Sequence, residues 1–112
     1  MVMVDSIYKY LEPYCDCYPI WTVHKKEFNI YPVSVSPNIM DMTADISFRI
    51  CSSKYETINL NTYKIISKKA RDFLFNHFKG IIEYNETFSL IDKYIDINLK
   101  IMEFYNDNTN WN

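Results

Sequence analysis

The sequence has 112 residues, 48% of them hydrophobic and 17% aromatic, which is enough for one compact domain (1–112) that folds without disulfides. A single glycine argues against a glycine-rich phosphate-binding loop, and a net charge of −2 excludes a globally basic nucleic-acid binder. Three cysteines, no cleavable apolar leader and no apolar run long enough to span a membrane predict a protein of the cytoplasm.

Within segment 1–14 the pattern predicts a short helix that begins after Asp5 as its N-cap and ends near Pro13. Segment 18–36 then alternates apolar and polar residues on both sides of the polar run 24–27, which predicts a β-hairpin. Prolines in both arms, such as Pro32, lack a backbone N–H and are expected at an edge of the sheet.

Segment 44–51 has the clearest strand pattern in the first half. Ile46, Phe48 and Ile50 fall on one face, and Asp45, Ser47 and Arg49 fall on the other. After a turn at 52–54, Ile58 and Leu60 alternate within segment 55–60. We therefore expect this segment to return as the second strand of a second hairpin.

Segment 61–80 has the pattern of one long helix. At about 100° per residue, its apolar residues form a stripe typical of a helix lying on a core. These residues are Ile66, Ala70, Phe73, Leu74 and His77. Asn61 or Thr62 offers a side-chain oxygen for the N-cap, and Gly80 suits the position after the helix, where a positive φ is favoured.

The last part of the chain predicts a short apolar segment at 81–84, a turn at 85–86 and a strand at 94–104. Together the elements predict an α+β fold with a short N-terminal helix, two β-hairpins, one long helix packed on a mostly antiparallel sheet, and two or three C-terminal strands. The expected core contains Ile46, Phe48, Ile66, Phe73, Leu74, Ile97 and Leu99.

Cysteines and histidines are the candidates for a metal site. Cys15 and Cys17 are two residues apart, and Cys51, His24 or His77 would have to complete the ligand set. This spacing differs from the common zinc patterns, so we predict free thiols and no metal. His77 on the apolar helix face is expected to be a packed core residue, and His24 is expected on an exposed turn.

The sequence contains no organised catalytic motif. The acidic residues show no pair spaced for hydrolytic chemistry, and there is no serine-hydrolase elbow, zinc-protease motif or phosphate-binding loop. We expect no cofactor and favour a binding protein over an enzyme.

The long helix carries cations on the face opposite its apolar stripe, with one aromatic ring among them. The candidate binding residues are Lys64, Lys68, Arg71, Phe75 and Lys79. Residues 62–80 contain five Lys or Arg and one Asp, a net charge of +4, between segments of −2 (1–61) and −4 (81–112). Either the acidic segment folds back and neutralises a helix on which Phe75 is covered, or Phe75 is an aromatic anchor ringed by cations.

The sequence therefore predicts a small intracellular, non-catalytic protein that binds an acidic surface of another protein through this helix face. A nucleic-acid-binding protein that uses the same face is the alternative, and a small enzyme of unknown reaction is the third. Heavy use of Ile, Asn, Lys and Tyr is typical of an AT-rich genome. It suggests a viral or phage accessory factor that modulates a host protein in the host cytoplasm.

Overall fold

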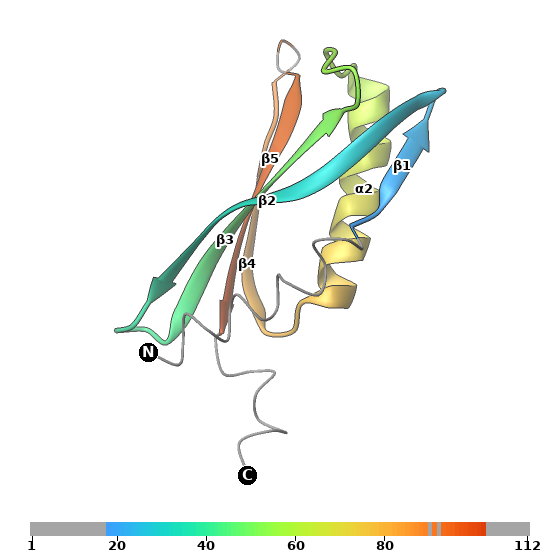
Figure 1. Cartoon of the computed structure of the whole chain (residues 1–112). Coiled ribbons are helices and arrows are strands. Elements are labelled where there is room, and N and C mark those ends of the chain that lie inside the picture. The colour runs from blue at the N-terminus through green and yellow to red at the C-terminus, as the bar shows by residue number, and fades with distance from the viewer. Residues whose placement is uncertain (1–17, 90, 92, 103–112) are drawn as a thin grey trace.

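The computed structural model describes residues 18–89, 91 and 93–102, and the predicted helix at 1–14 lies outside these ranges. Within them, five strands form a curled antiparallel sheet in the order β1-β2-β3-β5-β4, with α2 on one face (Figure 1). The elements are β1 (Ile20–Val23), β2 (Lys26–Asn38), β3 (Thr43–Ser52), α2 (Leu60–His77), β4 (Ile81–Thr87) and β5 (Tyr94–Met102). The predicted α+β class is confirmed.

A two-residue turn joins β1 to β2. Val23 pairs with Lys26, and the residues between them, His24 and Lys25, have φ angles of 52° and 66°. Positive φ at both central residues is the type I′ geometry, whose twist matches that of the paired strands. The turn falls within the polar run 24–27.

β2 continues far beyond β1. Only its first four residues, Lys26–Asn29, pair with β1, so the rest of β2 is an edge of the sheet on that side. Pro32 lies in this edge part, where a missing N–H removes no bond of the sheet. The register with β3 shifts between Pro32 and Ser34. The far tip of the β2–β3 pair extends away from α2 (Figure 1).

The second predicted hairpin is wrong. Segment 55–60 does not pair with β3, which has β2 on one side and β5 on the other. The segment starts in a turn, where the Ser52 hydroxyl accepts the Glu56 backbone N–H at 2.9 Å. Ile58 is buried and Leu60 is the first residue of α2. The spacing of these two apolar residues resembled a strand, but they lie in the connection to the helix and at its first residue.

The alternating patterns of 44–51 and 94–104 belong to neighbouring central strands. β3 and β5 pair without a register shift, from Thr43 with Met102 to Cys51 with Tyr94. Their apolar residues are buried on the face that α2 covers. β4 lies beside β5 and continues through positions 85 and 86, so the turn predicted there is wrong.

α2 begins earlier than the sequence pattern indicated. Asn59 is the N-cap, and its side-chain oxygen accepts the backbone N–H of Thr62 at 2.9 Å. The prediction of Asn61 or Thr62 as the cap is therefore wrong. A cap must precede the first helical turn, and both residues are already inside it.

The C-terminal end of α2 corrects the prediction for His77, which is exposed rather than packed in the core. Its Nδ1 lies 2.9 Å from the carbonyl oxygen of Phe73. Phe78 is buried instead, with an extended backbone and its N–H donated to the Leu74 carbonyl at 2.9 Å. The chain leaves the helix after His77, and Phe78 in its extended conformation packs against Phe48 of the core, with ring centroids 5.7 Å apart. Gly80 has the expected positive φ, 72°.

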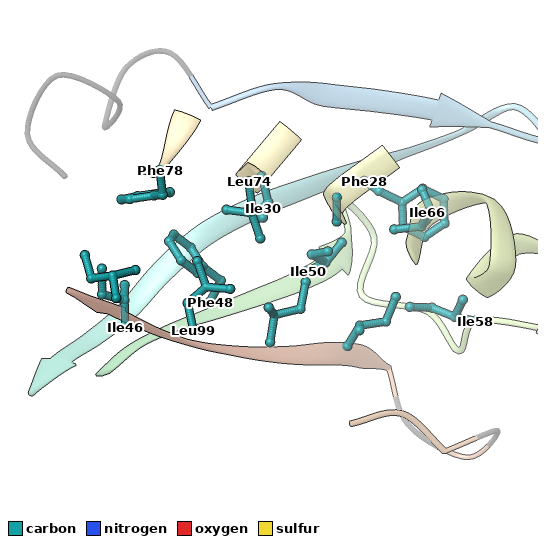
Figure 2. Packing of buried hydrophobic residues seen from close by; sticks show 14 of the residues in the cluster. Phe28, Ile30, Ile46, Phe48, Ile50, Ile58, Ile66, Leu74, Phe78 and Leu99 are labelled. Carbon is teal, nitrogen blue, oxygen red and sulfur yellow. The ribbon is translucent and has the colours of Figure 1, made fainter. Parts of the chain in front are cut away.

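The core lies between α2 and the sheet (Figure 2). Its buried apolar residues include Phe28, Ile30, Ile46, Phe48, Ile50, Ile58, Ile66, Leu74, Phe78, Ile97 and Leu99. Phe73, which we expected in this core, is only partly buried at its margin. The Phe73 ring packs edge-on against Tyr18 and Trp21, with centroid distances of 5.8 and 6.4 Å.

The sheet face opposite α2 is polar, and no helix of the described residues covers it. On this face the Arg49 Nε donates to Asp96 at 2.9 Å, and the guanidinium lies 3.8 Å from the centroid of the Tyr94 ring. The Asn98 amide donates to the Ser47 hydroxyl at 3.0 Å. In the same part of the chain, no helix combines the length and the apolar character that a membrane span requires.

Candidate functional site

The candidate site lies where one side of α2 meets β4, and we define the α2–β4 surface as Arg71, Phe75 and Tyr84. Arg71 and Phe75 are one turn apart on the helix and share a face. Tyr84 projects toward the same side because it pairs with Leu99, whose side chain is buried beneath the helix. The Phe75 and Tyr84 ring centroids are 5.5 Å apart at 32°, and the Arg71 Cζ lies 5.6 Å from the Tyr84 centroid.

Phe75 remains 46% exposed although it contacts Tyr84. The described residues therefore support the ring from one side and leave the other open. A hydrophobic ring held this way loses little additional conformational freedom when a partner covers it. The alternative in which the acidic C-terminal segment covers this face involves residues 103–112, which lie outside the described ranges.

The half-buried carboxylate of Glu86, two residues from Tyr84 on β4, binds the Tyr84 hydroxyl. Glu86 accepts hydrogen bonds from the hydroxyls of Tyr63, Ser67 and Tyr84, the last two at 2.8 and 3.1 Å. Two of these donors are on α2 and the third is on β4. The network therefore ties the edge strand to the helix and limits the rotation of the Tyr84 ring.

Both phenols of this network are held in the protonated state. Burial raises the pKa of Tyr84 well above its ordinary value, the Glu86 charge raises it further, and Arg71 opposes the shift. Burial, followed by the hydrogen bond to Glu86, also raises the pKa of Tyr63. Tyr63 and Tyr84 therefore remain hydrogen-bond donors to the carboxylate near neutral pH.

The other predicted binding residues are Lys64, Lys68 and Lys79, and all three are exposed. Lys64 and Lys68 line a shallow hollow of about 410 Å³ on the outer side of α2. The Lys68 Nζ lies 3.0 Å from an Asp72 carboxylate oxygen one turn away, an exposed pair that contributes little to stability. Lys79 is exposed in the connection between α2 and β4.

Sequence reasoning missed Tyr84 and Glu86. The expected turn at 85–86 would have ended the strand before Glu86 and separated the two residues. Tyr84 and Phe88 have the spacing of one strand face, but Glu86 between them interrupts the apolar alternation, although all three are half-buried in the structure. Three positions at an edge strand are too few to distinguish this pattern from a loop.

The cysteines and histidines weighed as candidate metal ligands are not brought together within the described residues. Cys15 and Cys17 lie outside the described ranges, and Cys51 is a half-buried thiol on β3. His24, expected on an exposed turn, is exposed there, with its Nδ1 3.0 Å from the Thr62 hydroxyl. In residues 18–89, 91 and 93–102, no group of three His, Cys, Asp or Glu side chains is arranged to hold a metal ion.

The described residues also form hollows away from this surface, and two of them can be compared with it. One of about 440 Å³ lies beside the β1–β2 turn and is lined by both signs of charge, including the ion pair of Lys26 with Glu56 at 3.3 Å. The other, about 330 Å³, lies on the polar sheet face between Arg49 and Asn98. Neither contains an exposed aromatic ring of the kind that Phe75 offers.

Comparisons with protein-family models, curated proteins and solved structures find no match for this chain.

Proposed function

We propose that this chain is a non-catalytic interaction protein that binds an acidic surface of another protein through the α2–β4 surface. The observation that carries the proposal is the half-exposed Phe75 ring, supported by Tyr84 and flanked by the guanidinium of Arg71. Aromatic and arginine side chains on a rigid support are the residues that most often dominate binding energy at interfaces.

The charge around the surface supports an acidic partner. Residues 62–80 carry a net charge of +4, and all five of their basic side chains are exposed. Such charges mainly accelerate association and orient the partner, while the ring contributes to the lifetime of the complex. The viral or phage role suggested by composition rests on that composition alone.

Nucleic acid is the alternative partner, because a base could stack on Phe75 while Arg71 meets a phosphate. Two observations favour a protein. Lys68 is already paired with Asp72, and the chain as a whole carries a net charge of −2. A long polyanion would be repelled by the acidic segments on either side of the helix, whereas a discrete acidic patch can contact the basic face alone.

The test compares wild type with Phe75→Ala. Loss of the ring is expected to weaken binding of a captured partner about 30-fold, which corresponds to about 2 kcal/mol. Unfolding free energy should fall by no more than about 1.5 kcal/mol, because only a half-exposed aromatic pair is lost. Partner identity comes from affinity capture with mass spectrometry, affinity from titration calorimetry, and stability from urea denaturation.

Ile65→Ala is the matched control, since Ile65 is a comparably exposed apolar residue on the outer side of the same helix. It should retain the partner. If Phe75→Ala unfolds the protein, or if both variants bind equally well, the surface is not the site. Oligonucleotide binding that weakens steeply with salt and is lost in Phe75→Ala would instead support the nucleic-acid alternative.

A further inference from the structure

β4 is an edge strand directly beside the α2–β4 surface. It pairs with β5 on one side, and no strand of the described residues pairs with its other side. An edge strand presents backbone N–H and C=O groups that another extended chain can pair with. The surface proposed above therefore borders a backbone that is able to receive one more strand.

One backbone hydrogen bond at the start of β4 establishes which β4 residues direct their N–H and C=O groups outward. The Met102 N–H donates to the Gly80 carbonyl at 3.0 Å, so these two residues face each other across the β4–β5 pair as a bonded pair. Bonded and non-bonded positions alternate along β5, so Lys100, Asn98 and Asp96 are bonded to β4 as Met102 is. Their partners on β4, beyond the register shift, are Glu83, Asn85 and Thr87. Tyr84 and Glu86 pair without such bonds, and their N–H and C=O groups point to the free edge.

The length of edge that is able to pair is short. The register shifts between Ile81 and Glu83, which distorts the first half of β4, and such bulges disfavour strand addition. The regular part is 84–87. It contains the two residues with outward-directed backbone groups, and one of them is Tyr84 of the α2–β4 surface.

We propose that the partner contributes an extended acidic segment that adds to the sheet beside β4 at Tyr84 and Glu86. Neighbouring strands lie about 4.8 Å apart, and alternate side chains of an added strand face the α2 side. There they meet Phe75 and Arg71. Phe75 is apolar and Arg71 is cationic. Of the alternate residues of the segment that face this side, one should therefore be aromatic or aliphatic, to contact Phe75, and one should be acidic, to pair with Arg71.

This inference rests on the proposed function and adds the conformation of the partner to it. The probe is a displayed library of short random peptides, selected on the wild-type chain and counter-selected on Phe75→Ala. Selected peptides should carry Asp or Glu close to an aromatic or aliphatic residue at alternating spacing. A synthetic peptide of the selected sequence is then used for all further measurements.

Amide hydrogen exchange measured by NMR tests the strand pairing. On addition of the peptide, the amides of Tyr84 and Glu86 should exchange at least about tenfold more slowly. The amides of Asn85 and Thr87 are the internal control, since they are already bonded to β5 and should change less. In the peptide, N-methylation of alternate residues that face β4 should abolish binding, whereas N-methylation of the residues between them should not.

The outcomes separate the two proposals. Peptides that depend on Phe75 but bind as helices, or that leave the Tyr84 and Glu86 amides unprotected, would overturn strand addition and retain the surface as the site. Failure to recover any Phe75-dependent peptide would overturn both. Concentration-dependent dimerisation in sedimentation, with protection of the same two amides, would show that a second copy of the chain occupies the edge and would overturn the peptide proposal.

Discussion

The side chain of Glu86 connects its own strand, β4, to the helix α2. Its carboxylate accepts hydrogen bonds from hydroxyl groups of both α2 and β4, and one of these donors is the half-buried Tyr84 whose ring contacts Phe75. Hydrogen bonds to a charged acceptor are stronger than those between neutral groups, and several on one carboxylate restrict its donors together. The order of the α2–β4 surface therefore depends on the Glu86 carboxylate as well as on the residues that form the surface.

The raised pKa of Tyr84 makes stability depend on alkaline pH. The folded state keeps the phenol proton more tightly than the unfolded chain, whose tyrosines titrate at about pH 10. Below that pH the contribution to stability is fully present. Above it the unfolded chain loses its proton first, so the unfolding free energy should fall as the pH rises toward the folded-state pKa. Urea midpoints across this range measure the effect.

Two variants separate the causes of this alkaline loss. Tyr84→Phe should make the fall less steep, because one titrating group is gone, while the raised pKa of Tyr63 keeps part of the loss. Glu86→Gln should flatten it only in part, because burial, the largest cause, remains when the charge is removed. A Tyr84→Phe variant that loses stability above pH 10 as steeply as wild type would show that the pKa of Tyr84 is not the source.

At the scale of elements, long alternating or periodic segments were predictable and short ones were not. Residues 44–51 and the strand within 94–104 alternate over many positions, and both are central strands whose inner residues are fully buried. Segment 55–60 offered only two matches and is a connection. β4 is an edge strand whose outer residues contact solvent, so burial imposes a weaker pattern on it.

The start of α2 was displaced in the prediction because Asn59, Asn61 and Thr62 are all acceptable caps by residue type. The structure selects Asn59, which accepts the Thr62 N–H. We expect Asn59→Ala to lower the unfolding free energy by about 1 kcal/mol, the usual cost of losing an N-cap. Asn61→Ala is the control and should be close to neutral, since Asn61 is exposed and already helical. Equal effects in urea denaturation would contradict the assignment.

At the scale of the whole molecule, the exposed face of α2 could be predicted from the sequence of the helix alone, whereas the complete α2–β4 surface could not. Helical phase placed Phe75 away from the core, and the ring is indeed half exposed. The support for that ring comes from Tyr84, which is nine residues later on a different element. Its position depends on the pairing of β4 with β5, a long-range property that no local pattern in the sequence determines.

The order of the strands predicts how protection from hydrogen exchange is distributed in the free protein. β3 and β5 each have a strand on both sides, and their inner residues are buried beneath α2. Their amides should exchange only through global unfolding, with opening free energies within about 1 kcal/mol of the unfolding free energy. Tyr84 and Glu86 should exchange much faster, because their amides point to the free edge. Slow exchange at these two positions in the monomeric free protein would show that another part of the chain already covers the β4 edge.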